Sequence, residues 1–296
     1  MGNQIKSGLI FVFSFFFLFS VLISSSHADS EEELFNTGVI QFKTGQLDEA
    51  LVTFSELIDT YPSNAKAHKN RGVIYMKQKQ YDLAIHDFEK AKSIAPDLTG
   101  IYSNLGVAYY YKKDYPASIE NYDLEIEQNP SNHFALFNRG LCHAALENHG
   151  KAVQDMNRTL ELKPGFYWAL CYKGDLLIKL QRRFGARAAF LEAVKTEPEQ
   201  PYAKIRLESV ETGLKDLYFL QAGAFLNETN ARKLRDELSS KQFQAGIFEK
   251  RVKDKLFYFI RVGEYADETT AASDREELQQ KLGIKSIVKP ARFIFE

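Results

Sequence analysis

Small and large residues recur along the first two thirds of the chain with a period of 34 residues. Glycines and prolines both follow this spacing: Gly38, Gly72, Gly106, Gly140 and Gly174, and Pro62, Pro96, Pro130, Pro164 and Pro198. The same frame holds a second small residue and, four positions later, a large one: Ala50, Ala84, Ser118, Ala152 and Ala186, then Phe54, Phe88, Tyr122, Met156 and Phe190. Small residues let two helices approach closely, a large residue fills the groove between them, and proline ends a helix. The pattern predicts five antiparallel helix pairs over 29–200.

One further helix is expected after the fifth pair, within 201–216. Its apolar residues are predicted to cover the exposed apolar face of the last pair, as terminal capping elements do in repeat proteins. These residues are Ala203, Ile205, Leu207, Val210 and Leu214. The remaining residues, Lys215 and Asp216, are charged and form a short linker.

From residue 217 the period changes from that of a helix pair to alternation between strands and helices. Strands are expected at 217–225, 245–252, 256–265 and 284–291, with a hairpin turn at 253–255. Asn227 is expected to cap a helix that runs to about Lys241, and Asp267 a second one that ends at Gly283. The order β-α-β-β-α-β predicts a four-stranded antiparallel sheet with both helices on one face and the other face open. The fold class is therefore multidomain, an all-α superhelix followed by an α+β domain at 217–296.

The two halves of this last segment match each other after a shift of 40 residues. Gln221-Ala222-Gly223-Ala224-Phe225 corresponds to Arg261-Val262-Gly263-Glu264-Tyr265. The match extends to Leu217, Phe219, Glu228, Thr229, Ala231 and Leu238, which correspond to Phe257, Phe259, Glu268, Thr269, Ala271 and Leu278. Each half therefore reads as a strand, a turn marked by glycine, and a helix.

Residues 1–28 have the features of a secretory signal peptide. Lys6 supplies a weak basic region, Leu9 to Ile23 is an apolar run, and Ser26-His27-Ala28 is a cleavage site before Asp29. An uncleaved anchor is the alternative, but a helix over 9–23 would rise about 22 Å, less than a hydrocarbon core of roughly 30 Å. We expect an exported, periplasmic protein with no membrane span after cleavage.

Composition and motifs argue against catalysis and nucleic-acid binding. The net charge is −1 and charged residues make up 26% of the chain, so no overall field attracts nucleic acid. No nucleophile elbow, zinc-protease motif, phosphate-binding loop or Cys-x-x-Cys pair is present. His143, Glu147 and His149 straddle an expected turn and are predicted to be surface residues, so no metal or cofactor is expected. Cys142 and Cys171 are expected to be buried and unpaired, with a disulfide as the less favoured alternative.

The five-fold pattern resembles the tetratricopeptide (TPR) repeat. This resemblance implies a concave surface, lined by the first helix of each repeat, that binds a protein or peptide. The expected groove residues are Phe35, Phe42, Lys69, Met76, Tyr110, Phe137, Leu141 and Trp168. Repeats that hold a peptide carboxylate carry an inward Asn where this chain has Val or Leu and, in the fifth repeat, Asp175, so an apolar helix or extended peptide is favoured. Packing of these side chains within the solenoid is the alternative.

The last segment resembles the SPOR domain, a module of the bacterial cell envelope. The resemblance rests on Gln221, Gly223 and Phe225, on Arg261 to Tyr265, and on the alanine eight residues after each glycine. It implies binding of peptidoglycan, specifically glycan strands without stem peptides, on the sheet face away from the helices. The Gln of the family motif matches Gln221.

Alternation places Tyr218, Leu220, Ala222, Tyr258, Ile260 and Val262 toward the helices. The other face would carry Phe219, Gln221, Phe257, Phe259 and Arg261, which we expect to bind glycan through stacking on the rings and hydrogen bonds to Gln221 and Arg261. Two alternatives stay open. The residues 292–295 or the solenoid itself would cover the phenylalanines as a second core, or the sheet would bind RNA, which export and charge disfavour.

We therefore expect an exported, non-catalytic adaptor of the cell envelope, bound to peptidoglycan at sites of amidase action such as the division site. The TPR groove would hold a partner protein there. The alternative is a TPR scaffold of an envelope or secretion complex whose SPOR-like domain docks protein rather than glycan.

Overall fold

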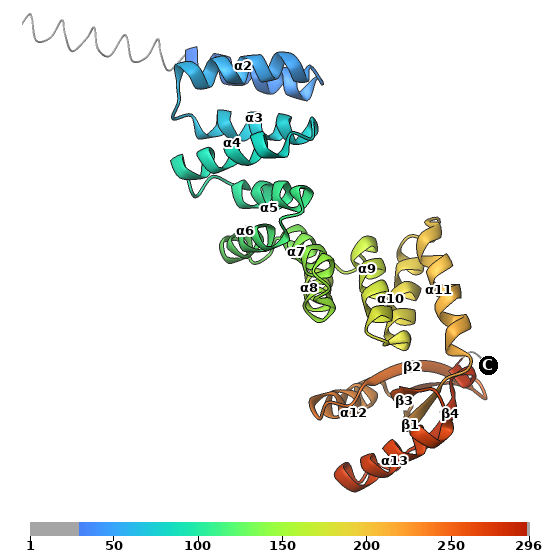
Figure 1. Cartoon of the computed structure of the whole chain (residues 1–296). Helices are drawn as coiled ribbons and strands as arrows, with labels where there is room; N and C mark the ends of the chain where they lie inside the picture. The colour runs from blue at the N-terminus through green and yellow to red at the C-terminus, as the bar shows by residue number, and fades with distance from the viewer. Residues whose placement is uncertain (1–29, 295–296) are drawn as a thin grey trace, which may run out of the picture. The chain divides into compact units, whose positions relative to one another are not determined.

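The computed structural model describes residues 30–294, so the predicted signal peptide at 1–28 lies outside the described residues. The described residues form two compact units, divided between Cys142 and His143, which are considered separately below. Both contain paired helices, and the second also contains the sheet (Figure 1).

Helix pairs build the N-terminal unit. A helix over 30–43 comes first. It is followed by α2 (Leu47–Thr60), α3 (Ala65–Lys77), α4 (Tyr81–Ile94), α5 (Ile101–Lys112), α6 (Tyr115–Gln128) and α7 (His133–Ala145), of which the residues up to Cys142 belong to this unit. The second helices α2, α4 and α6 all end two residues before a proline of the 34-residue frame, as expected from the loss of a backbone donor.

The recurring glycines lie directly against the recurring aromatic rings. A Cβ atom added to Gly72 would lie 2.7 Å from Phe88, and one added to Gly106 would lie 2.7 Å from Tyr122. No carbon atom can approach that closely, so a side chain at these positions would force the two helices of a repeat apart. The close approach explains why glycine and a large ring recur together with a fixed spacing.

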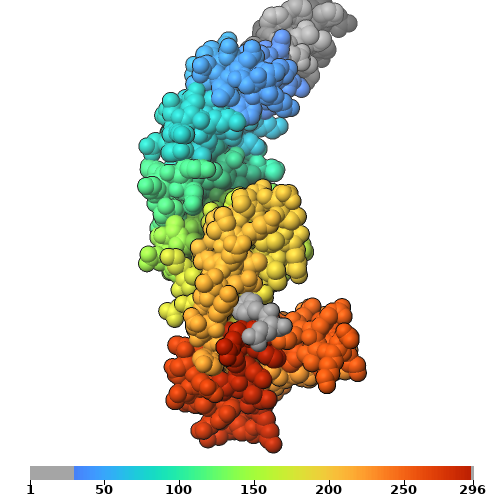
Figure 2. Space-filling model, turned by 90° about the vertical axis from the view of Figure 1, so that its right-hand side faces the viewer, coloured from blue at the N-terminus to red at the C-terminus, as the bar shows by residue number. Residues whose placement is uncertain are grey.

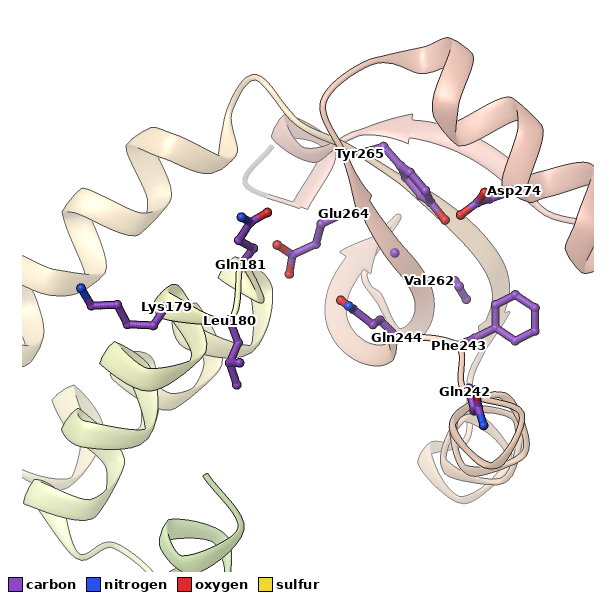
Figure 3. Close-up of a pocket in the computed structure, with 11 residues that line it drawn as sticks. Lys179, Leu180, Gln181, Gln242, Phe243, Gln244, Val262, Glu264, Tyr265 and Asp274 are labelled. Atoms are coloured by element: carbon purple, nitrogen blue, oxygen red, sulfur yellow. The ribbon is translucent and has the colours of Figure 1, made fainter. Parts of the chain in front are cut away.

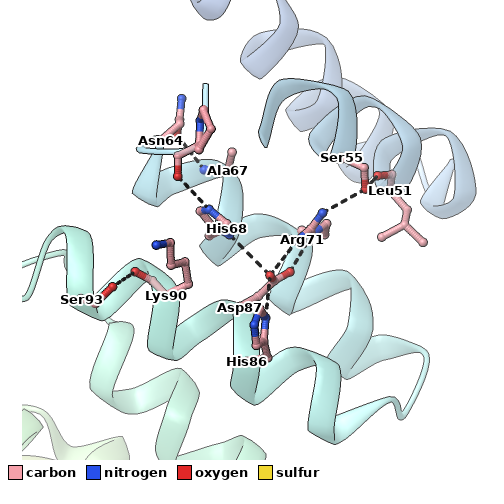
Figure 4. A network of polar contacts seen from close by, with 11 residues as sticks. Leu51, Ser55, Asn64, Ala67, His68, Arg71, His86, Asp87, Lys90 and Ser93 are labelled. Carbon is pink, nitrogen blue, oxygen red and sulfur yellow. Dashed lines mark hydrogen bonds and ion pairs between the residues drawn. The ribbon is translucent and has the colours of Figure 1, made fainter. Parts of the chain in front are cut away.

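A buried carboxylate joins the two helices of the second repeat (Figure 4). Asp87 of α4 accepts hydrogen bonds from Arg71 Nε at 2.7 Å and Arg71 Nη2 at 2.8 Å, and its side chain is buried. Arg71 also donates to Ser55 Oγ of α2 at 3.3 Å, while His68 Nδ1 lies 3.4 Å from Asp87 Oδ1. The hydrogen bonds to Asp87 raise the pKa of Arg71. This network fixes the register of α2, α3 and α4.

The C-terminal unit continues the helices with α8 (His149–Leu162), α9 (Tyr167–Lys179), α10 (Arg183–Thr196) and α11 (Pro201–Leu214). Figure 2 shows α11, in gold, on the surface of this unit. Ala203, Val210 and Leu214 are buried, as expected for a capping helix. The prediction is wrong for Ile205, which is 63% exposed and so does not help to cover the last pair.

The sheet follows α11 and has the predicted order of elements. These are β1 (Tyr218–Phe225), α12 (Glu228–Ser240), β2 (Ala245–Val252), β3 (Lys255–Tyr265), α13 (Glu268–Leu282), β4 (Ile287–Pro290) and a 3-10 helix, η1 (Ala291–Ile294). The strands pair antiparallel in the order β2-β3-β1-β4. Strand β4 is shorter than expected, since Ile284 packs on the helix-side core and Ala291 begins η1. Figure 1 shows α12 and α13 on one side of the sheet and α10 on the other.

The core between the sheet and its helices confirms the predicted strand faces. Leu220, Ala222, Ile260 and Val262 are buried in it, and Tyr218 and Tyr258 pack at its edge. From the helices come Ala231 and Leu238 of α12 and Ala271 and Leu278 of α13, all fully buried. These four residues are two pairs of the 40-residue internal match. The fold class, helical repeats followed by an α+β domain, is confirmed.

Candidate functional site

Phenylalanine rings form a continuous cluster on the sheet face away from α12 and α13. Phe248 of β2 stacks on Phe259 of β3, with ring centroids 5.2 Å apart and an interplanar angle of 14°. Phe219 of β1 meets Phe248 edge to face at 5.6 Å, and Phe257 lies 5.9 Å from Phe259. The structure thus brings the three predicted phenylalanines together and adds Phe248, which the sequence analysis did not include.

The prediction that this face is open to solvent is wrong at two of the three phenylalanines. Phe219 is 0% and Phe259 6% exposed, while Phe257 is half-buried. Two side chains from outside the sheet cover them: Phe184 of α10 meets Phe219 edge to face at 5.9 Å, and Phe293 of η1 meets Phe259 at 5.8 Å. A row of rings on one face is a large apolar area, and burying it against other rings removes it from water.

Segment η1 is held on the sheet face by lysine side chains. Lys250 Nζ donates a hydrogen bond to the Phe293 carbonyl oxygen at 2.8 Å and lies 4.0 Å from the centroid of the Phe293 ring. Lys289 Nζ lies 5.0 Å from the same ring. Phe293 of η1 therefore covers Phe259 through ring contacts and is itself held by cation–π contacts with the two lysines.

Gln221 and Arg261 pair with each other across β1 and β3, as a site on one face requires. Gln221 is half-buried. The Arg261 guanidinium lies 4.4 Å from the centroid of the Phe184 ring and packs over Gly246, where an added Cβ would be 2.8 Å from Arg261 Nη2. Burial lowers the pKa of Arg261 to about 10. The Arg261 guanidinium, which was predicted to donate hydrogen bonds to glycan, is therefore covered by Phe184 of α10 in this structure.

Glu264 is the functional candidate that sequence reasoning missed. Its two carboxylate oxygens accept hydrogen bonds from the first backbone N–H groups of α10: Arg183 N to Oε2 at 2.7 Å and Phe184 N to Oε1 at 2.8 Å. The side chain of Arg182, the N-cap residue of α10, makes no capping hydrogen bond. Glu264 thus caps α10 from 80 residues away, at the end of the helix where a negative charge is stabilised. Burial is the largest influence on Glu264 and raises its pKa.

A β-bulge at Gly263 directs Glu264 toward α10. The register passes from Tyr218↔Tyr265 to Leu220↔Val262, so Gly263 and Glu264 both lie opposite Phe219. Gly263 has φ +72°, a left-handed conformation that favours glycine, and an added Cβ would lie 2.3 Å from the Tyr265 ring. The sequence signal was available: in the internal match Glu264 stands where the first half has Ala224, so the shared fold does not require an acidic residue there.

Glu264 also lines a cleft of about 510 Å³ in the C-terminal unit (Figure 3). The turn at Lys179 to Gln181 forms one wall, and Gln242, Gln244 and Tyr265 contribute to the other. Figure 3 shows the Glu264 carboxylate directed toward the turn at Gln181, and Tyr265 facing Asp274. Three glutamine amides and two carboxylates are among the lining groups, so the cleft can form hydrogen bonds with a polar ligand.

The expected groove residues of the N-terminal unit are half-buried and not fully exposed: Phe35, Phe42, Lys69, Met76, Tyr110, Phe137 and Leu141. Phe35 packs edge to face on Phe54 at 6.0 Å, and Lys69 Nζ donates to the Thr99 carbonyl oxygen at 3.2 Å. Burial lowers the pKa of Lys69. Phe35 and Lys69 thus contact neighbouring elements of the helical stack, and each expected groove residue keeps part of its surface accessible.

In the C-terminal unit, Trp168 is 48% exposed, whereas Asp175 is engaged by the capping helix. Asp175 Oδ1 accepts from Arg206 Nε at 2.7 Å, and Asp175 Oδ2 accepts from the Tyr202 hydroxyl. Asp175 thus binds α11 rather than an external peptide in this structure.

Within residues 30–294, no group of three or more His, Cys, Asp or Glu side chains could hold a metal ion. Cys142 and Cys171 are buried and form no disulfide, and burial raises the pKa of Cys171 to about 11. Among the helices in that range, none is both long and apolar enough to span a membrane.

Comparison with known families identifies both parts of the chain. Models of the tetratricopeptide repeat match residues 34–64, 65–98 and 103–165, and the SPOR domain model matches residues 215–290. The chain is a tetratricopeptide repeat protein with a C-terminal SPOR domain. Both resemblances drawn from the sequence are confirmed. The TPR repeats are protein-interaction modules and the SPOR domain belongs to a peptidoglycan-binding family, and neither is a catalytic module. SPOR domains are typical of envelope-associated proteins.

Solved structures with the TPR fold resemble the chain at low sequence identity. The TPR protein YrrB, described as having an unusual peptide-binding site, is 20% identical with a TM-score of 0.54, and covers 59% of this chain and 90% of its own. MamA is 23% identical with a TM-score of 0.53, covering 55% and 95%. PilF of Pseudomonas aeruginosa is 19% identical with a TM-score of 0.52, covering 63% and 91%. These likenesses show the fold. No curated protein matches the chain.

Proposed function

We propose that the chain is an exported adaptor of the bacterial cell envelope. Its SPOR domain binds peptidoglycan, and its TPR repeats hold a partner protein in the periplasm. The signal-like sequence of residues 1–28 and the envelope association typical of SPOR domains both support this location. Amidases remove stem peptides from glycan strands, so the SPOR domain would collect the adaptor where they act, as at a division site.

The observation that carries the glycan proposal is the row of phenylalanines on the sheet face of a domain whose family binds peptidoglycan. Apolar C–H faces of sugars stack on aromatic rings, and amide or guanidinium groups bind hydroxyl and acetamide oxygens. Phe219, Gln221, Phe257, Phe259 and Arg261 would supply these contacts. Phe257 and Gln221 are partly accessible in this structure and would make the first ones.

Co-sedimentation with purified sacculi, before and after amidase treatment, tests the glycan proposal. The protein is residues 29–296, and the variants are Phe257→Ala and Gln221→Ala. We expect wild-type binding to rise after amidase treatment and both variants to lose about tenfold in affinity, about 1.4 kcal/mol each. Phe134→Ala is the matched control, because Phe134 is also partly exposed but lies on α7. Binding that does not rise after amidase treatment, or that is equal in the folded wild type and both variants, would contradict the proposal.

For the TPR repeats, the half-buried residues on the first helices of the N-terminal unit would form the binding surface, from Phe35 to Leu141. Their accessible apolar surface fits an amphipathic helix or an extended peptide better than a charged terminus. Trp168 of the C-terminal unit is the most exposed of the proposed contacts.

A second candidate function is favoured by the contacts of α10. Here the sheet face already binds protein, through Phe184, Arg261 and Glu264. This supports a TPR scaffold of an envelope or secretion complex whose SPOR domain docks protein rather than glycan. Glycan fragments would not displace a protein partner from such a scaffold, whereas they would do so if glycan and protein share the sheet face.

A further inference from the structure

We propose that the N-terminus of α10 and the side chain of Glu264 form a latch that closes the glycan-binding face of the SPOR domain. A glycan strand and the fifth repeat would then compete for one surface, and the chain would bind peptidoglycan tightly only after the latch opens. This inference rests on the glycan proposal above and adds its regulation.

The latch covers the part of the face with the richest binding chemistry. Phe184 is 4% exposed and contacts both the Phe219 ring, at 5.9 Å, and the Arg261 guanidinium, at 4.4 Å. A sugar ring stacked on Phe219 would have to occupy the volume of Phe184. A hydroxyl or acetamide bound by Arg261 would displace the same ring. A glycan strand and Phe184 therefore cannot occupy this part of the sheet face at the same time.

Phe184 is not needed by the repeat to which it belongs. It is the second residue of α10, and the same position in the other four second helices holds Asp48, Asp82, Pro116 and Gly150. Polar or small residues and proline suit the first turn of a helix. A phenylalanine offers no capping group or charge to this turn, and its ring contacts Phe219 and Arg261 of the sheet.

Glu264 is likewise not needed by the SPOR fold. The matching position of the first half is Ala224, which is exposed. The core between the sheet and its helices contains neither Glu264 nor Phe184. Phe184 and Glu264 therefore both differ from the residues at equivalent positions in the repeats of their own domains. These two residues contact each other in the structure.

The latch is small enough to open reversibly. It consists of one ring, one cation–π contact and two charge-assisted hydrogen bonds. The link from α11 to β1 is short, with Lys215 and Asp216 both exposed. A short link holds the fifth repeat at high effective concentration near the sheet, so the closed state forms readily without a large interface.

Two variants of residues 29–296 are designed to open the latch. Each substitutes a residue that the chain has at the equivalent position of another repeat. Phe184→Asp copies the first two repeats and keeps a favourable charge at the start of α10. Glu264→Ala copies the first half of the SPOR domain. Glu249→Ala is the matched control, because Glu249 is exposed on β2 and lies on the helix side of the sheet.

Hydrogen exchange and co-sedimentation with amidase-treated sacculi are measured on the same proteins. In the wild type we expect slow exchange at the amides of Arg183 and Phe184, which donate to Glu264. Both opening variants should lose this protection, keep slow exchange at Ile260 in the core, and bind sacculi about tenfold more tightly than the wild type and Glu249→Ala. Glu264→Gln keeps an acceptor oxygen but loses the charge. Its binding of sacculi should therefore be intermediate between that of the wild type and that of the opening variants.

Opened variants that bind sacculi no more tightly than the wild type would overturn the latch and leave the glycan proposal standing. Variants that exchange hydrogen as open molecules but still fail to bind would overturn the glycan proposal itself, and with it the competition. If Phe184→Asp does not fold, as judged by exchange at Ile260, the comparison of Glu264→Ala with Glu264→Gln decides the result. Faster exchange at Arg183 in the presence of glycan would be direct support.

Discussion

Gly174 of α9 has no room for a side chain, because Phe190 of α10 packs against it. An added Cβ atom would lie 2.5 Å from Phe190 Cζ, closer than real Cβ contacts come. The same pair occurs at Gly38 with Phe54, Gly72 with Phe88 and Gly106 with Tyr122. At the residue scale, the 34-residue period is thus a steric fit between a glycine and a ring in four of the five repeats, while the fourth repeat has Met156 in place of the ring.

We expect Gly174→Ala to destabilise the protein by about 1–3 kcal/mol, the usual cost of overpacking a core. Gly213→Ala is the matched control. Gly213 lies in α11 with nothing within 4 Å of an added Cβ, and alanine is the better helix former there by about 0.5–1 kcal/mol. Urea unfolding followed by circular dichroism should show opposite signs for the two variants. Equal effects would contradict the steric account.

Asp87 is the second residue whose role can be tested in isolation. Asp87→Ala would leave Arg71 without its carboxylate partner between α3 and α4, at a cost of about 3–5 kcal/mol. Asp123→Ala removes a carboxylate that pairs with Arg139 at 2.6 Å but is 55% exposed, so the expected loss is below about 1 kcal/mol. Chemical denaturation of both variants measures the difference. A loss at Asp87 no larger than at Asp123 would show that the buried network is not needed for stability.

At the element scale, the two helices of the SPOR domain start with equivalent side-chain caps. Asn227 Oδ1 accepts from Asn230 N at 3.3 Å, and Asp267 Oδ1 accepts from Thr270 N at 2.8 Å. Asp267 Oδ2 also accepts from the Thr270 hydroxyl at 3.0 Å. The internal match at 40 residues therefore extends to the way each helix begins.

The cap of α13 predicts a pH dependence. The hydrogen bonds from Thr270 favour the ionised carboxylate and lower the pKa of Asp267. A group with a lowered folded-state pKa stabilises the fold above its unfolded-state pKa, here about 3.9, and this contribution is lost as the pH falls through the folded value. Wild type should therefore melt at a higher temperature than Asp267→Ala at neutral pH, and the difference should vanish in acid. Asp216→Asn, in the exposed linker, is the control and should follow the wild type. A constant difference across this range would contradict the account.

At the scale of the molecule, the helical stack of the C-terminal unit ends at α11, which must cover what a sixth repeat would otherwise bury. Leu214 is fully buried and Ile205 is 63% exposed on the same helix. We expect Leu214→Ala to cost about 2–5 kcal/mol, the range for large-to-small changes in a core. Ile205→Ala should change stability by less than about 0.5 kcal/mol. Hydrogen exchange in α10 would report both, and a similar effect of the two variants would show that α11 does not act as a cap.

The residue patterns predicted both parts of the fold because each depends on local periodicity. The pair Gly72 and Phe88 recurs at the 34-residue spacing, and Ala231 recurs after 40 residues as Ala271. Both patterns arise because elements that are adjacent in the sequence pack on each other. The assignment of Leu220 and Ile260 to the helix side was correct for the same reason, since strand alternation is a local rule. Ile205 was assigned wrongly because its apolar character alone does not show which side of α11 faces α10.

What covers the other sheet face was decided only by the tertiary structure. The sequence by itself determined that Phe219, Phe257 and Phe259 share that face, and it left open whether sugar, the C-terminal segment or the solenoid would cover them. The structure places Phe293 and Phe184 there, and it uses Glu264 to hold α10 in position. These contacts join residues up to 81 positions apart. No periodic pattern encodes such a contact, because it depends on the shape of two surfaces that exist only after each domain has folded.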